Sequence, residues 1–224
     1  RQMTITVNRT HKVQYNKKRI RRLMQILNLK SVCRKKRYKY IYSKPEMVAE
    51  NVLNREFYAD APNEKWLTDV TEFKYYVGTE VKKVYLSAIL DLYDRRIVAY
   101  KIGASNNNSL VFDTFDEAIQ KNPEAHPLFH SDRGFQYTNK TFHNKLMEAG
   151  MRQSMSRVGR CIDNGPMEGY WGLLKSEMYY LKKFYSEKEL TEAIEKYIEF
   201  YNTKRYQLKL HCMTPMEYHA AFAA

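Results

Sequence analysis

The sequence predicts an α/β domain, with a mixed five-stranded sheet and flanking helices, preceded by a small basic helical segment. Two observations carry this prediction. From residue 65 onward, three strand-like stretches with short connections are followed by helices that alternate with two shorter strands. Residues 1–44, in contrast, contain 15 Lys and Arg residues and neither Asp nor Glu. The chain therefore divides into a polybasic head and a body that carries the sheet.

Size, charge and cysteine content indicate a chain with one domain and a smaller module, without a membrane span or a disulfide framework. The chain has 224 residues, enough for one domain and a smaller module, and a net charge of +13. Because the head contributes +15, the rest of the chain carries 13 − 15 = −2. No apolar run approaches the roughly 20 residues of a membrane span. The three cysteines are widely separated and odd in number, which argues against a disulfide framework or a zinc knuckle and fits a reducing cytosol.

The head is expected to contain one helix, over residues 17–28, with no folded partner before it. Its apolar residues recur at helical spacing, while Lys and Arg occupy the other face. Such a face suits a nucleic acid backbone or an anionic membrane, and a solvated tail is the alternative. Binding to phosphates would weaken steeply with salt. The candidate nucleic-acid contacts are Lys17, Lys18, Arg19, Arg21, Arg22, Arg34, Lys35, Lys36 and Arg37.

The body is predicted over residues 61–224, after a polar linker over residues 45–60. Its first three strands are expected at 66–76, 83–93 and 96–103, where β-branched, aromatic and aliphatic residues concentrate. The connections between them are short, so we expect antiparallel neighbours.

Helices and strands then alternate. Polar residues 106–109 cap a helix, a fourth strand follows at 126–131, a helix over 141–149 stops at Gly150, and a fifth strand occupies 151–155.

Three helices complete the predicted body. The first extends over residues 164–181. Ser186 with Glu189 gives a capping-box signal for the second, and Thr214 with Glu217 repeats it for the third. The whole order, three strands followed by alternating helices and strands, is that of an RNase H-like fold.

Three carboxylates are the candidate chemistry of this body: Asp69, Asp132 and Glu168, with 35 residues between the last two. Phosphoryl transfer needs little covalent chemistry from a protein and is served by two Mg²⁺ ions about 4 Å apart on hard oxygen ligands. Acids are rarely buried without a partner or a metal. From position alone, Asp69 is equally well a solvent-facing strand residue, and Asp132 an ordinary turn residue.

Helical geometry favours Glu168 as the third carboxylate. At about 100° per residue, the apolar residues of this helix form one stripe. Glu168 and Lys175 project to one border of that stripe and Glu177 to the opposite border. A surface salt bridge between Glu168 and Lys175 is the alternative, although their seven-residue spacing is poor for one.

Eight short motifs carry a family resemblance. They are WLTDVTEF at 66–73, LDLYDRRIV at 90–98, HSDRGFQY at 130–137, SMSR at 154–157, DNGPME at 163–168, LKSE at 174–177, YNTKR at 201–205 and TPME at 214–217. The chain resembles DDE transposases of the retroviral-integrase superfamily, and more narrowly the second-frame products of insertion-sequence-three-type elements. The resemblance covers nearly the whole chain.

This resemblance implies a function. Asp69, Asp132 and Glu168 would form a catalytic triad that binds Mg²⁺ or Mn²⁺, with Asp69 bridging two ions, and Lys175 would contact DNA. The implied reaction is cleavage of element ends and their joining to target DNA. The implied partners are the terminal repeats, the target DNA and further copies of the chain, at the nucleoid in a bacterial cytoplasm, with no membrane partner. The head would be the remnant of a helix-turn-helix.

Two other functions remain open. One is a noncatalytic, truncated transposase that binds DNA as a repressor, and the other is a general RNase H-like nuclease.

Several polar residues near the triad have simpler interpretations. His130 could position water or a phosphate, and a residue packed in the sheet is the alternative. We interpret Asp91 and Asp94 as turn-forming, because the next strand follows directly. Asp163 and Asn164 are expected to shape the loop before the Glu168 helix, with Asn164 as its N-cap.

Overall fold

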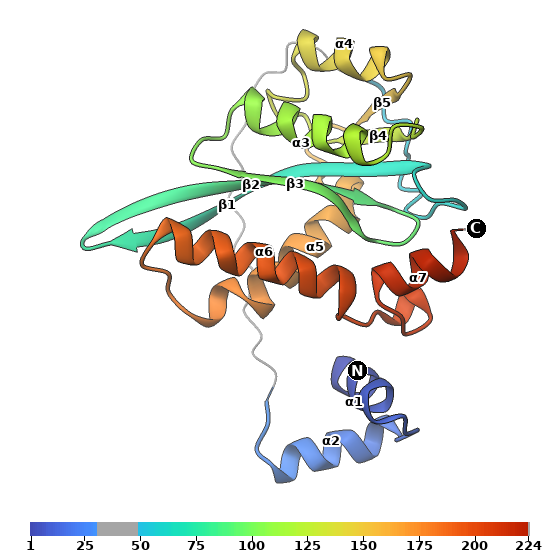
Figure 1. Ribbon diagram of the computed structural model, residues 1–224, viewed down its shortest axis with the longest axis vertical. Coiled ribbons are helices and arrows are strands. Elements are labelled where there is room, and N and C mark those ends of the chain that lie inside the picture. The colour runs from blue at the N-terminus through green and yellow to red at the C-terminus, as the bar shows by residue number, and fades with distance from the viewer. Residues whose placement is uncertain (31–48, 224) are drawn as a thin grey trace.

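The computed structural model describes residues 1–30 and 49–223 (Figure 1). The predicted basic contacts Arg34, Lys35, Lys36 and Arg37 lie outside the described residues. No helix in the described part of the chain is both long and apolar enough to cross a membrane.

The head contains two helices, α1 (Gln2–His11) and α2 (Lys17–Ile26). The sequence predicted only the second, because α1 is rich in β-branched residues and has no side-chain cap. The side chain of Asn8 exchanges two hydrogen bonds with the backbone of Tyr15 and closes the turn between the helices. Of the apolar face expected on α2, Ile20 is buried, whereas Leu23 is 42% exposed.

Five strands form the predicted mixed sheet in the order β3-β2-β1-β4-β5. Their bounds are β1 (Lys65–Val77), β2 (Glu80–Asp91), β3 (Ile97–Gly103), β4 (Leu128–Ser131) and β5 (Arg152–Met155). The first three are antiparallel, while β4 pairs in parallel with both β1 and β5. This arrangement confirms the predicted RNase H-like fold.

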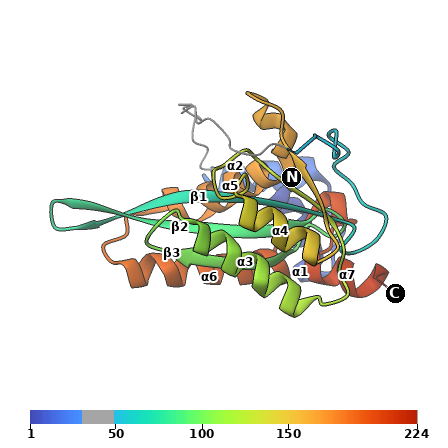
Figure 2. The ribbon, with the colours of Figure 1, turned by 90° about the horizontal axis from the view of Figure 1, so that it is seen from above.

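Helices cover both faces of the sheet (Figure 1). One layer holds α3 (Asn108–Lys121) and α4 (Lys140–Glu148), and the other holds α5 (Gly165–Glu177), α6 (Glu187–Thr203) and α7 (Pro215–Phe222). The β1–β2 hairpin projects beyond the helices (Figure 2). Three 3₁₀ turns complete the body: Cys161–Asn164, Tyr179–Leu181 and Leu208–Leu210.

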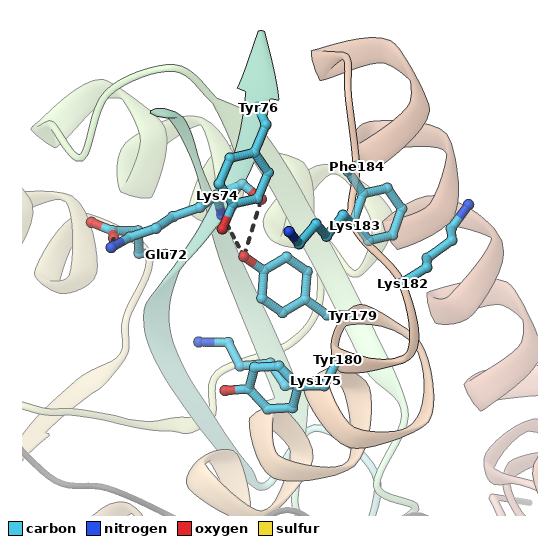
Figure 3. A pocket seen from close by; sticks show the side chains of 9 residues that line it. All are labelled: Glu72, Lys74, Tyr76, Lys175, Tyr179, Tyr180, Lys182, Lys183 and Phe184. Atoms are coloured by element: carbon cyan, nitrogen blue, oxygen red, sulfur yellow. Dashed lines mark hydrogen bonds and ion pairs between the residues drawn. The ribbon is translucent and has the colours of Figure 1, made fainter. Parts of the chain in front are cut away.

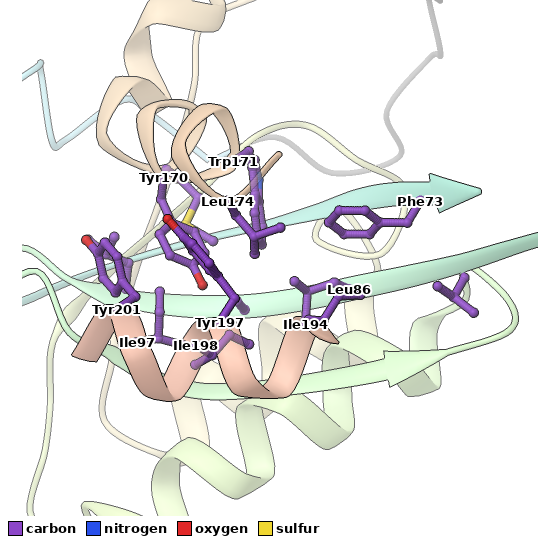
Figure 4. Packing of buried hydrophobic residues seen from close by; sticks show 14 of the residues in the cluster. Phe73, Leu86, Ile97, Tyr170, Trp171, Leu174, Ile194, Tyr197, Ile198 and Tyr201 are labelled. Carbon is purple, nitrogen blue, oxygen red and sulfur yellow. The ribbon is translucent and has the colours of Figure 1, made fainter. Parts of the chain in front are cut away.

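Each face of the sheet has its own apolar core. Between the sheet and α5 and α6, buried side chains include Leu86, Trp171, Leu174, Ile194 and Tyr201 (Figure 4). A second cluster under α3 and α4 includes Trp66, Phe115, Phe129 and Phe142. Burial of each large apolar side chain stabilises the folded state by about 1.5–3 kcal/mol, so both helical layers stabilise the sheet.

The edge of β1 changes partner along its length, and this positions the candidate site. β4 pairs with β1 only at Lys65–Leu67. Farther along, Tyr76 N donates to Phe184 O at 2.9 Å, and Lys74 N donates to the Tyr179 hydroxyl at 2.9 Å. The segment after α5 therefore covers the strand edge that β4 leaves open.

Some predicted boundaries differ from the structure. The helix expected over 164–181 ends at Glu177, because Met178 leaves helical geometry with φ −128°. Only half of the capping box at Ser186 forms, since the Glu189 carboxylate accepts from Tyr185 N instead of Ser186 N. The capping box of Thr214 with Glu217 forms in full.

Part of the predicted linker packs against the body. Leu53 is 1% exposed within the core cluster beneath α5 and α6. The backbone N–H groups of Val52 and Leu53 both donate to Ser154 Oγ on β5. This segment is therefore attached to the edge of the sheet next to the candidate site.

Candidate active site

The three candidate carboxylates come from three neighbouring elements. Asp69 lies within β1, Asp132 directly follows the end of β4, and Glu168 lies in the first turn of α5. Because β1 and β4 run parallel with Leu67 opposite His130, two further residues along each strand lead to Asp69 and Asp132. All three side chains are half-buried.

Electrostatics link the three acids. Burial first, and then the charge of Asp132, raise the pKa of Asp69 to about 8, and Glu168 adds to this rise. Burial likewise raises the pKa of Asp132, while the N–H of Gly134 counteracts it. The charges of Asp132 and Glu168 therefore disfavour the ionised form of Asp69, an effect that a bound cation would relieve.

The site does not form a tight chelate. Across residues 1–30 and 49–223, no group of three or more His, Cys, Asp and Glu side chains is close enough to hold a metal ion. The donors are nevertheless carboxylate oxygens, which hard divalent cations prefer. Catalytic contacts are often long before substrate binds and tighten in the complex.

Hydrogen bonds orient both oxygens of Asp69. Trp171 Nε1 donates to Oδ2 at 2.9 Å, and Val70 N donates to Oδ1 at 2.8 Å. Both bonds lower the pKa of Asp69, against the effect of burial. Sequence reasoning placed Trp171 in the core stripe and missed this role. Its position three residues after Glu168, on the same side of α5, was the available signal.

A second hydrogen bond fixes the start of α5. Asn164 Nδ2 donates to Thr68 O at 3.0 Å, at the residue just before Asp69. Asn164 stands at the N-cap position as predicted, but its side chain bonds to the strand and makes no cap bond. The helix that carries Glu168 is thereby tied to the strand that carries Asp69.

Asp163 holds the loop before α5. Its buried carboxylate pairs with Arg157 and Arg55 at 2.8 and 2.7 Å and accepts from Asn51 Nδ2 at 2.9 Å. Hydrogen bonds from Arg157 hold the pKa of Asp163 well below its usual range. This agrees with the expected loop-shaping role.

The side chain of Lys175 contacts the part of β1 that follows Asp69. Its ammonium donates to Thr71 Oγ1 at 2.5 Å and lies 5.1 Å from the ring centre of Phe73. Burial lowers the pKa of Lys175, while the charges of Asp69 and Glu72 raise it. The predicted DNA contact therefore lies beside the proposed triad.

Glu177 has a structural role. Its carboxylate makes a two-pronged ion pair with Arg205, at 2.6 and 2.8 Å, and accepts from the Tyr197 hydroxyl. These bonds tie the end of α5 to α6, which favours Glu168 over Glu177 as the third carboxylate.

The remaining polar candidates also have structural partners. His130 is fully buried between Ser154 and Ser156, and burial lowers its pKa to about 4. Asp94 pairs with Arg96 and His219, and Asp91 accepts from the backbone at the same turn. These arrangements agree with a packed histidine and two turn-forming acids.

The basic residues of α2 are exposed. This holds for Lys17, Lys18, Arg19, Arg21 and Arg22. Their contact with nucleic acid stays a prediction.

Models of known families match most of the body. An integrase core domain model matches residues 59–161, and a second integrase core domain model matches residues 168–221.

Relatives match nearly the whole chain. The chain is 42% identical to the putative transposase InsK for insertion sequence element IS150 of Escherichia coli, covering 97% of this chain and 76% of that protein. It is 40% identical to an uncharacterized transposase-like protein of Haemophilus influenzae, covering 96% and 97%. The transposase for insertion sequence element IS904 of Lactococcus lactis is 34% identical, covering 91% and 80%.

Solved structures share the fold. The HTLV-2 integrase catalytic core domain in complex with magnesium aligns with a TM-score of 0.54 at 19% identity, covering 71% of this chain and 97% of that chain. A simian T-cell lymphotropic virus intasome in complex with the PP2A regulatory subunit B56 gamma gives 0.60 at 18%, covering 88% and 66%.

Proposed function

Because this chain belongs to the DDE transposases of insertion-sequence-three elements and is a DNA transposase, we propose that Asp69, Asp132 and Glu168 are its catalytic carboxylates. The arrangement of the acids supports the proposal: the parallel register of β1 and β4 leads to two of them, and Glu168 on α5 acts electrostatically on Asp69.

We propose that the triad holds divalent cations, Mg²⁺ or Mn²⁺. The carboxylate donors and their mutual repulsion support this, as does the magnesium in the HTLV-2 integrase core. Two bound ions supply activation of the attacking oxygen and stabilisation of the leaving oxygen. Asp69, Asp132 and Glu168 would hold these ions through their carboxylate oxygens.

Hydrogen bonds from the surrounding residues orient the proposed catalytic side chains. Trp171 and the Val70 N–H hold the Asp69 carboxylate in one orientation, and Asn164 holds α5 against β1. Lys175 lies where its ammonium can neutralise a DNA phosphate beside the triad.

We propose a division of labour along the chain. Residues 1–44 bind DNA through phosphate contacts, residues 45–60 connect, and residues 61–224 cleave element ends and join them to target DNA. Because two element ends must meet in one complex, the active form is a multimer on DNA, in line with the intasome neighbour. A DNA-bound protein of this kind belongs at the bacterial nucleoid.

Alanine at Asp69, Asp132 or Glu168 tests the site. Each variant should lose Mg²⁺-dependent nicking and strand transfer on an element-end duplex while DNA binding stays largely intact. Glu124→Ala, an exposed acid outside the site, is the control and should keep both. Cleavage retained in a triad variant removes that residue from the site, and cleavage without joining favours a nuclease.

A further inference from the structure

A basic pocket lies beside the proposed triad, between the outer half of β1 and the segment that follows α5 (Figure 3). Its volume is about 420 Å³. Its lining is lysine and aromatic side chains with a single acid: Glu72, Lys74, Tyr76, Lys175, Tyr179, Tyr180, Lys182, Lys183 and Phe184.

Positive charge in the pocket is only partly neutralised. Lys182 pairs with Glu189 at 2.9 Å, and Lys74 lies 3.9 Å from Glu72. Lys175 and Lys183 have no carboxylate within 4.0 Å among the described residues. Lys175 is still within electrostatic range of Asp69 and Glu72, whereas Lys183 forms no ion pair with a described residue, and its charge favours an anionic ligand in this cavity.

The aromatic wall of the pocket is held in place. The Tyr179 hydroxyl bonds to both the N–H and the carbonyl of Lys74, at 2.9 and 3.0 Å. The Tyr179 ring stacks on Phe184 at 5.9 Å and 4°. Lys183 approaches the ring of Tyr76, with 5.7 Å to its centre, and Tyr180 is 43% exposed. The Tyr180 ring packs against Tyr179, with 5.3 Å between the ring centres.

The strand β1 connects the pocket to the triad. Asp69 lies three residues before Glu72 and seven before Tyr76. At about 3.3 Å per residue, the pocket lining begins about 10 Å from Asp69 and extends to about 23 Å. A DNA strand with its reacting phosphodiester at Asp69 would place its next few nucleotides here.

We propose that this pocket binds an unpaired stretch of the DNA strand adjoining the reacting phosphodiester. Lys183 and Lys74 contact backbone phosphates, and the exposed part of the Tyr180 ring stacks on a base. A cationic groove with aromatic faces is the usual site for single strands, because paired bases have their faces covered by neighbours. The inference rests on the proposed function, since the triad defines where the reacting phosphodiester lies.

DNA binding in EDTA tests the pocket without any chemistry. Fluorescence anisotropy would compare a blunt element-end duplex with the same duplex carrying a single-stranded extension. Tyr180→Ala should weaken binding of the extended duplex roughly 5- to 150-fold, the range for loss of one stacked base. Tyr180→Phe should bind as the wild type does, because it keeps the ring.

Lys183 supplies the electrostatic arm of the test. Lys183→Ala should lower the salt slope for the extended duplex by about 1. Lys196→Ala on α6, an exposed lysine outside the pocket, should leave it unchanged. Thermal unfolding would check that each variant is folded. If Lys183→Ala is not folded, Lys183→Gln takes its place.

Three results would overturn the proposal: no loss for Tyr180→Ala, an equal loss on blunt and extended duplexes, or an unchanged salt slope for Lys183→Ala. Binding in EDTA is independent of the triad. An Asp69→Asn variant that still cleaves would refute the proposed catalytic site and leave this binding result untouched.

Discussion

Replacing Trp171 by phenylalanine removes the indole N–H that donates to Asp69 and keeps most of the aromatic packing. The Trp171 ring lies 5.1 Å from Tyr170, a contact that a phenylalanine ring can preserve. A hydrogen bond to a charged group is worth about 1.5–3 kcal/mol. Without it, the Asp69 carboxylate loses one of the two groups that favour its charged form.

The effect should appear in the metal requirement. Changes to residues that orient metal ligands typically cost about 10- to 100-fold in metal affinity or activity. We therefore expect the Mg²⁺ concentration for half-maximal cleavage by Trp171→Phe to rise by about that factor, with DNA affinity in EDTA unchanged. The assay is cleavage of an element-end duplex across a Mg²⁺ titration.

The chain offers a matched control. Trp66 is also buried and donates to Asn63 Oδ1 at 3.2 Å, but it belongs to the core cluster of the opposite sheet face. Trp66→Phe should lower stability and leave the Mg²⁺ midpoint unchanged. An equal Mg²⁺ midpoint in Trp171→Phe and the wild type would refute an orienting role for this indole.

Two further perturbations follow from the charges. The pKa of Asp163 is lowered in the folded state, so its stabilisation is complete above the unfolded value near 4 and is lost as pH falls below it. Asp163→Asn should lower the free energy of unfolding by about 1.5–3 kcal/mol at pH 7, measured by thermal unfolding. This difference from the wild type should shrink below pH 4, and a constant difference down to pH 3 would contradict the reasoning. Replacing both Lys17 and Lys18 by alanine should reduce the salt slope of DNA binding by roughly 0.9 per lost phosphate contact. The same double change at Lys188 and Lys196 should not, and equal slopes in both pairs would exclude α2 as the DNA contact.

The sequence was sufficient for the sheet because its strands carry long β-rich runs and its turns are short. Each of the five predicted strands forms, with ends shifted by a few residues at most. The first helix was missed because Thr4, Ile5 and Val7 weaken the helical signal and no side chain caps its start.

Sequence reasoning named the proposed residues of the candidate site but not the contacts that support them. The family resemblance pointed to Asp69, Asp132 and Glu168, and helical geometry favoured Glu168, whereas the register of β1 with β4 depends on pairing between distant segments. The bonds from Trp171 to Asp69 and from Asn164 to Thr68 join residues about a hundred positions apart. Local patterns cannot reveal such contacts, because they exist only once the helix packs on the strand.

The basic pocket was beyond sequence reasoning for the same reason. Lys74 and Tyr76 alternate with buried residues along β1 and are typical of an ordinary strand. Lys182 and Lys183 follow the helix in a segment with no distinct signal. Only the folding of that segment against the open edge of β1 brings them together.

Strand transfer by Glu168→Gln and Glu177→Gln is the most direct test of the catalytic triad. Both changes remove one negative charge from the same helix and keep the side-chain shape. With Mg²⁺ and an element-end duplex, Glu168→Gln should abolish cleavage and joining. Glu177→Gln should lower stability through its lost pairing with Arg205 and retain both reactions at a temperature where it is folded. The reverse pattern, an active Glu168→Gln and a folded but inactive Glu177→Gln, would contradict the proposed active site.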